Sequence, residues 1–189
     1  MSTIYLVRHG EVHNPQGIIY GHLPGYGLSQ KGREQLVQAA GLLQGRGPFQ
    51  GLYVSPLQRA QESAQILGEH LGLALTTEPL IVETGVEGYQ GQPFSALPRP
   101  YMTEERTVPG IECAASIRGR FLSWAAVVLE RHADGQLIAV SHRDPIVLSL
   151  LHWMGKGLEE LPEFPLAPGG VYKVCLETAS RAVQVEALG

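Results

Sequence analysis

The sequence contains little cysteine. Cys113 and Cys175 are its two cysteines among 189 residues, and they lie far apart without the spacing of a metal site. We expect small buried side chains or free thiols there. A chain of this length can bury a substantial core and needs neither a disulfide framework nor a structural metal to fold.

The sequence also lacks long apolar segments and an excess of positive charge. No run approaches the ~20 apolar residues that a membrane span requires, and no basic segment precedes the first apolar run at residues 3–7. The net charge is −4, whereas a general nucleic-acid binder needs a broad basic face. We therefore expect a cytoplasmic protein that binds neither nucleic acid nor a membrane; its oligomeric state is open, with a homodimer as one alternative.

Two common catalytic motifs are missing. No glycine-rich run ends in Lys-Ser/Thr, so the sequence predicts no P-loop nucleotide site. His9, Glu11 and His13 form His-Gly-Glu-Val-His, but the glutamate stands in the wrong place for the zinc helix motif. This segment also follows an apolar run typical of a strand. We expect no metal and no cofactor.

What is present is an alternation of short apolar runs with amphipathic segments. This alternation predicts a mostly parallel sheet with helices on both faces, a three-layer α/β/α sandwich in one domain spanning residues 1–189. Strands are expected at 4–7, 51–55, 73–77 and 137–140, with a closing pair at 171–176 and 182–185. Helices are expected after Ser29, after Ser55-Pro56, over 112–132 and after Asp144-Pro145. The proline-rich segment 78–110 is predicted to run over the surface.

Arginines and histidines follow three of the predicted strands. Arg8 and His9 come after the first, Arg59 after the second and His142 after the later one. The carboxyl ends of strands in an open α/β sheet form the ligand-binding edge. Two arginines and two histidines meeting there predict a cationic pocket in an acidic protein.

Such a pocket suits a phosphate dianion. Arg8 and Arg59 can each donate forked hydrogen bonds to phosphate oxygens. We expect Arg59 in the first turn of its helix, whose amino end also favours an anion. Gly10 is expected to let the backbone approach the ligand closely.

Five motifs resemble those of a known family, in the same order. The run from Leu6 to Glu11 is similar to the signature of the histidine phosphatase superfamily, which includes the cofactor-dependent phosphoglycerate mutases. The other four resemble the second arginine motif, the acid segment, the phosphatase-branch helix start and the second histidine motif, at 55–64, 83–91, 109–120 and 140–142. The resemblance implies a phosphoglycerate mutase-like fold.

The resemblance also implies roles. His9 would attack phosphorus and carry a phosphohistidine. Glu83 would protonate the leaving alkoxide and then serve as base for water, which requires a raised pKa. Arg8, Arg59 and His142 would hold the phosphoryl oxygens, without a metal.

Some positions depart from the family pattern. Asn14 lies five residues after the nucleophile, Gly21 lies in a differently composed loop, and Arg143 stands where glycine is common. From the resemblance we nevertheless predict that these three residues contact the substrate. Two interpretations stay open for Arg143, whose side chain adds charge toward the substrate or points to solvent. Glu87 is a rival to Glu83 as the acid.

The length of the cover over the site favours hydrolysis over transfer. The mutases carry an insertion that excludes water, whereas 17 residues separate Gly91 from Pro109 here. We expect hydrolysis of a small-molecule phosphate monoester. A phosphoglycerate-type mutase is the first alternative, and a non-catalytic protein that binds a phosphorylated ligand is the second.

Overall fold

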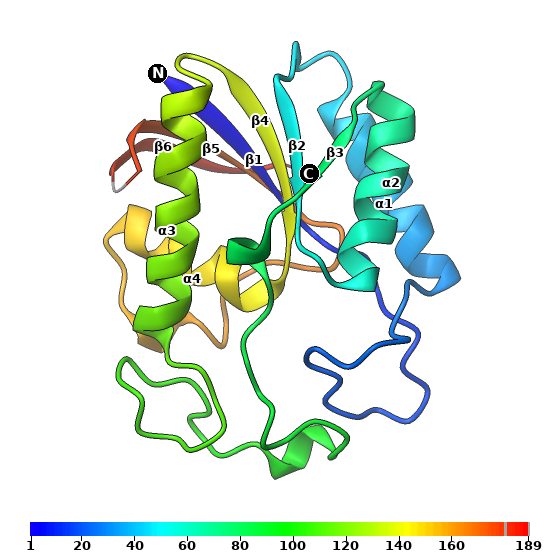
Figure 1. Cartoon of the computed structure of the whole chain (residues 1–189), viewed down its shortest axis with the longest axis vertical. Helices are drawn as coiled ribbons and strands as arrows, with labels where there is room; N and C mark the ends of the chain where they lie inside the picture. The colour runs from blue at the N-terminus through cyan, green and yellow to red at the C-terminus, as the bar shows by residue number, and fades with distance from the viewer. Residues whose placement is uncertain (180, 189) are drawn as a thin grey trace.

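A six-stranded sheet forms the centre of the molecule (Figure 1). The computed structural model describes residues 1–179 and 181–188. Strand order across the sheet is β3-β2-β4-β1-β5-β6. The first four strands are parallel, β5 pairs antiparallel with β1, and β6 pairs antiparallel with β5. The bounds are β1 Ser2–Arg8, β2 Gly51–Val54, β3 Leu75–Thr77, β4 Gln136–Ser141, β5 Val171–Thr178 and β6 Arg181–Leu188.

Helices cover both faces of this sheet. The helices are α1 Gln30–Leu43, α2 Gln58–Leu71, α3 Ala114–Arg131 and α4 Arg143–Met154. In Figure 1, α1 and α2 lie on one side of the sheet and α3 and α4 on the other. Along β1, Tyr5 and Val7 pack with the first pair, whereas Ile4 and Leu6 pack with the second. Burial on both faces explains the continuous apolar run of β1 and confirms the predicted three-layer, mostly parallel architecture.

Two helix starts differ from the prediction, while a third agrees with it. Ser29 caps α1, accepting a hydrogen bond from the Gly32 amide. The Ser55-Pro56 prediction is wrong, because α2 begins at Gln58 without a side-chain cap. The Asp144-Pro145 prediction is also wrong: α4 begins one residue before Asp144, and the Asp144 carboxylate accepts hydroxyl hydrogen bonds from other segments.

The segment 78–110 is more than a surface excursion, which corrects the prediction. It contains two short 3₁₀ helices, Pro79–Ile81 and Phe94–Ala96, and Ile81 and Met102 belong to the main core. Val86 packs with Ile19 and Ile111 in a separate apolar cluster. The segment therefore joins the loop after β1 to the body of the protein.

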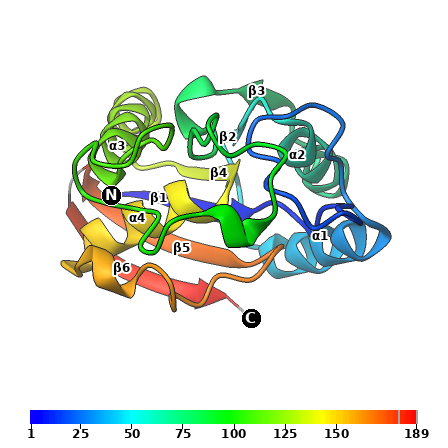
Figure 2. The same cartoon turned by 90° about the horizontal axis from the view of Figure 1, so that it is seen from below.

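Loops gather at one end of the molecule. Residues 10–29 and 82–113 both lie beyond the carboxyl ends of the parallel strands, at the bottom of Figure 1. Figure 2, viewed from below, shows the green segment crossing in front of the sheet at this end. Among the helices of the described chain, none combines the length and the apolar character needed to cross a membrane.

The end of β1 makes an unusually close contact with α1. A Cβ added to Gly10 would lie 2.4 Å from the Gly32 carbonyl oxygen, and one added to Gly32 would lie 2.1 Å from the Glu11 carbonyl oxygen. These neighbours are backbone atoms that cannot rotate away. The structure thus gives Gly10 a role that the sequence did not predict: the lack of a side chain admits α1.

We predict opposite stability effects for two alanine substitutions in α1. Gly32→Ala should lower the free energy of unfolding by about 1–3 kcal/mol or more, because its methyl group meets fixed backbone. Gly41→Ala, on the exposed face with nothing within 4 Å of the added Cβ, should raise it by about 0.5–1 kcal/mol. Urea denaturation measures both, and equal effects would contradict the contact.

Candidate active site

His9 lies directly after β1 with 3% of its surface exposed. Its Nδ1 is 2.7 Å from the Gly10 carbonyl oxygen. Burial and the positive charges of Arg59 and Arg8 lower the pKa of His9 well below its ordinary value of 6.5. The ring is therefore neutral at physiological pH. Because a carbonyl only accepts hydrogen bonds, the proton is on Nδ1, which leaves the lone pair of Nε2 available.

His142 is the residue before α4 and is fully buried. Its ring centre is 5.1 Å from that of His9. Burial, then the charge of Arg59, lowers the pKa of His142 well below 6.5. Its Nε2 is 2.6 Å from the Ser55 hydroxyl, whose proton has no other acceptor among the described residues, so this hydroxyl donates to Nε2. This assigns the N–H to Nδ1, a buried atom with no hydrogen-bond partner in the described chain.

In both Arg8 and Arg59, a terminal guanidinium nitrogen donates to a backbone carbonyl, whereas Nε has no hydrogen-bond partner among the described residues. Arg8 Nη1 donates to the Leu166 carbonyl at 2.6 Å, and Arg59 Nη2 donates to the Gly21 carbonyl at 3.0 Å. The Arg59 guanidinium also lies 4.7 Å from the centre of the Tyr20 ring. Both Nε atoms are buried and have no hydrogen-bond partner within the described residues. Buried charged donors without acceptors are costly, so these side chains are arranged for an anion.

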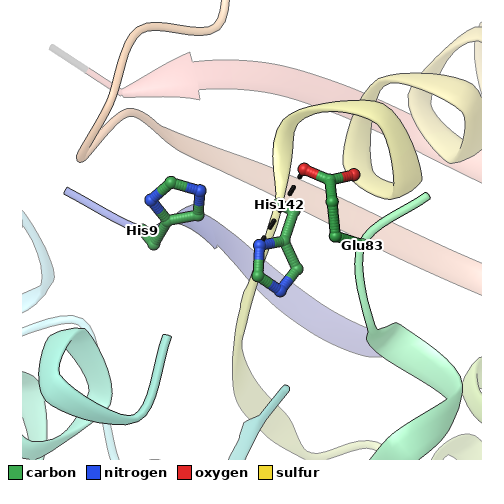
Figure 3. Close-up of side chains that lie close together, drawn as sticks. All are labelled: His9, Glu83 and His142. Carbon is green, nitrogen blue, oxygen red and sulfur yellow. Dashed lines mark ion pairs between the residues drawn. The ribbon is translucent and has the colours of Figure 1, made fainter. Parts of the chain in front are cut away.

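Glu83 comes from the segment between β3 and α3 and faces the two histidines (Figure 3). One carboxylate oxygen accepts the Thr84 amide at 2.8 Å, and the other is 3.9 Å from His142 Nδ1. Burial, and then the negative charge of Asp144, raises the pKa of Glu83 to about 7, although Arg59 and Arg8 oppose this change. A substantial fraction of Glu83 is thus protonated near neutral pH and able to donate a proton.

The sequence did not single out Asp144 or Tyr101 as site residues. The Asp144 carboxylate accepts hydrogen bonds from the Tyr101 hydroxyl at 2.9 Å and the Thr84 hydroxyl at 3.2 Å. Asp144 lies two residues after His142 of the second histidine motif, and this position was the one sign of a role at the site. The sequence instead favoured a helix cap at Asp144. No spacing links Tyr101 to position 144, because the two meet only through the path of the 78–110 segment.

Two side chains hold the backbone of Glu83. Arg120 Nη2 donates to the Glu83 carbonyl at 3.1 Å, and His22 Nε2 lies 2.8 Å from the same oxygen. Arg120 is itself bonded to Glu112 on both carboxylate oxygens, and Glu112 accepts the Gly85 amide at 3.2 Å. The Glu112–Arg120 spacing was visible in the sequence, whereas its attachment to Glu83 was not.

The three predicted substrate contacts have different surroundings in the structure. The Asn14 amide bonds the backbone of Ile18 within its own loop, and Asn14 is not among the described residues that line the cavity over Arg8 and Arg59. Gly21 lines that cavity, and its carbonyl holds Arg59. Neither arrangement tests substrate binding.

Arg143 also lines the cavity, and its side chain does not extend into solvent. Its Nη2 donates to the Leu161 carbonyl at 2.8 Å and to the Pro162 carbonyl at 3.0 Å. The two candidate acids differ in burial: the Glu87 side chain is 67% exposed, compared with 19% for Glu83. The geometry therefore favours Glu83.

Three groups lie close enough to share a metal ion. His9, Glu83 and His142 each offer one ligand atom, and these atoms lie within 4.8 Å of one another. Two imidazoles and a carboxylate form a set that zinc accepts. However, the positive charge of Arg59 acts on both imidazoles. The local potential therefore favours an anion over a cation.

Residues 4–187 match the family model of the histidine phosphatase superfamily (branch 1). The chain belongs to this superfamily. Rv0525 of Mycobacterium tuberculosis is 35% identical over 164 residues, which cover 83% of this chain and 81% of that protein. The 2,3-bisphosphoglycerate-dependent phosphoglycerate mutase of Thermoplasma acidophilum is 26% identical over 161 residues, 85% and 80% of the two chains.

The fold is shared with solved structures. A mutant phosphoserine phosphatase of Entamoeba histolytica, in complex with phosphoserine, superimposes with a TM-score of 0.81 at 21% identity, covering 98% of this chain and 96% of that one. Likeness at this identity supports the fold alone. Family membership places the chain among the phosphoryl-transfer enzymes.

We predict that Asp144→Asn moves the pH dependence of activity. Glu83 must be protonated to act as an acid, so kcat/KM of the wild type should fall as pH rises through about 7. The Asp144 charge raises the Glu83 pKa, and its removal should lower that pKa and move the falling limb to lower pH. Asparagine retains an oxygen that accepts both hydroxyls. The substrate's own ionisation is common to both proteins, so coincident profiles would contradict the coupling.

We also predict that Arg120→Leu lowers kcat by about 10- to 100-fold, because the Glu83 backbone loses a donor and the carboxyl moves. Arg118→Leu on the same helix is the matched control, since Arg118 pairs with Glu104, away from Glu83. Steady-state kinetics at several pH values reveal a change in the shape of the pH profile, which a displaced Glu83 produces and a smaller amount of folded protein does not. Equal kcat in the two variants would exclude a positioning role.

Proposed function

We propose that this protein hydrolyses small-molecule phosphate monoesters through a phosphohistidine on His9, without a metal. One observation carries the proposal. Three buried N–H donors, Arg8 Nε, Arg59 Nε and His142 Nδ1, have no hydrogen-bond partner in the described chain and belong to the side chains around a neutral His9. A phosphoryl group supplies acceptors for all three and an electrophilic phosphorus for Nε2.

In the first step, His9 Nε2 attacks phosphorus, an N–P bond forms and the P–O bond to the alcohol breaks. Protonated Glu83 gives its proton to the leaving oxygen, a contribution of about 10²–10⁴-fold. The two guanidinium groups and His142 Nδ1 stabilise the charge on the remaining phosphoryl oxygens. The products are the free alcohol, a phosphohistidine and the Glu83 carboxylate.

In the second step, the Glu83 carboxylate takes a proton from water, and the resulting hydroxide oxygen attacks phosphorus. The N–P bond breaks and inorganic phosphate leaves. His9 and protonated Glu83 are restored, so the cycle balances without a co-reactant. The same carboxyl serves as acid and then as base, which a pKa of about 7 permits.

Transfer to a second hydroxyl is the alternative, favoured by the similarity to the Thermoplasma acidophilum mutase. Both reactions share the phosphohistidine, and they differ in whether water or an alcohol accepts the phosphoryl group. The short connection between Gly91 and Pro109, 17 residues long, supports water. Measurement of phosphate release from phosphoglycerates decides between them: a mutase interconverts the isomers without stoichiometric free phosphate.

We predict that His9→Ala lowers kcat/KM for para-nitrophenyl phosphate by at least about 10³-fold, because the attacking nitrogen is lost. The assay contains excess chelator, and rapid quench with ³²P-labelled ester should trap an acid-labile adduct on the wild type alone. His152→Ala, an exposed histidine of α4, is the control and should retain full activity. Activity or labelling that survives in His9→Ala would refute the phosphohistidine.

A further inference from the structure

The cavity over Arg8, Arg59 and Glu83 is larger than a phosphoryl group requires. It has a volume of about 280 Å³ and includes Arg8, Arg59 and Glu83 in its lining. The rest of the lining comes mainly from the two loops at the carboxyl end of the sheet. Its apolar and aromatic members are Ile19, Tyr20, Val86, Phe94, Leu97 and Tyr101. This part of the cavity remains for the leaving group of the substrate.

The charges in this part of the cavity are already paired. Besides the three proposed catalytic groups, Arg143 and Asp144 are the charged residues of the lining. Their opposite charges face each other, with Arg143 Nη1 3.5 Å from the Asp144 carboxylate. Arg143 Nη2 donates to backbone carbonyls of residues 161–164, and Asp144 accepts the Tyr101 and Thr84 hydroxyls. Each of these two charged groups therefore already has partners within the protein.

The apolar wall is held by backbone hydrogen bonds between the loops. The Ile19 amide donates to the Gln92 carbonyl at 2.8 Å, and the Gly91 amide donates to the Ile19 carbonyl at 2.9 Å. Pro93 also pairs with Ile18 in an isolated bridge. These bonds fix the start of the short helix that carries Phe94, whose surface is 55% exposed although it lines the cavity. An apolar leaving group would cover this ring.

We infer that the substrate is a phosphate monoester of an uncharged, apolar or aromatic alcohol, whose apolar part packs against Phe94, Leu97 and Tyr101. The inference rests on the proposed function, since it names the leaving group of that reaction. It excludes phosphoglycerates and phosphorylated amino acids as preferred substrates, because their carboxylate would enter a largely apolar part of the cavity in which Arg143 is already paired with Asp144.

The test compares esters whose leaving groups are all aliphatic alkoxides, so that differences in intrinsic reactivity stay small. We expect kcat/KM for benzyl phosphate to exceed that for 3-phosphoglycerate and O-phosphoserine by at least about tenfold, as a hydrophobic pocket provides. Phe94→Ala should reduce the ratio between benzyl phosphate and 3-phosphoglycerate. Val127→Ala, which truncates an exposed valine of α3, should leave the ratio unchanged.

A binding measurement separates this inference from the catalytic proposal. Benzylphosphonate and 2-carboxyethylphosphonate cannot be hydrolysed at their P–C bonds, and calorimetry reports their affinity whether or not turnover occurs. We expect tighter binding of benzylphosphonate and loss of that preference in Phe94→Ala. Preference for the carboxylated compound, or for 3-phosphoglycerate or O-phosphoserine in turnover, would overturn the inference and leave the phosphohistidine intact. Failure to form phosphohistidine, with benzylphosphonate still preferred, would overturn the reaction and leave the pocket.

Discussion

The burial of two guanidinium groups beside two imidazoles is the interaction on which the site depends. Arg59 is 1% exposed and Arg8 is largely buried, so their charges act through a medium that screens them weakly. Burial, together with the charge of Arg59, lowers the pKa of His9 and of His142 and keeps both rings neutral, and Arg8 adds to the effect on His9. One ring therefore has a free lone pair and the other a free N–H. The two guanidinium charges therefore attract an incoming anion and repel an incoming cation.

This arrangement would be unstable if the arginines were wholly unsatisfied. Each is instead fixed by one carbonyl, from Leu166 and Gly21, and Arg59 also lies over Tyr20. One end of each guanidinium is therefore satisfied by the protein, while the Nε side is kept for the ligand. The fold thus holds the donors in place before the ligand arrives, so little reorganisation is needed when it binds.

The surroundings shift the pKa of Glu83 and the pKa values of the two histidines in opposite directions. Burial disfavours the charged form of each, which raises the pKa of the carboxyl and lowers the pKa of the imidazoles. The Asp144 carboxylate adds to the effect on Glu83 and is itself held by two hydroxyls. A neutral nucleophile and a protonated acid therefore coexist near pH 7, which is the combination that in-line attack with leaving-group protonation requires.

The amino-acid pattern alone is enough to predict the sheet and the four residues that gather at its edge. Continuous apolar runs specify strands buried on both faces, and the geometry of parallel strands brings their carboxyl ends to one edge. Arg8, His9, Arg59 and His142 follow from that rule alone, because each lies within a few residues of a strand end. The order of the motifs then identified the family, as its match over residues 4–187 shows.

The side chains that surround those four residues depend on tertiary contacts. The contacts of Asp144 with Tyr101 and Thr84, and of Arg120 with Glu83, join positions 37 to 60 residues apart in the chain through an irregular segment. Such a segment has no hydrophobic periodicity from which its path can be predicted. The same limit applies to the true starts of α2 and α4 and to the role of Gly10. There, hydrogen bonds and packing from distant segments outweigh local capping preference.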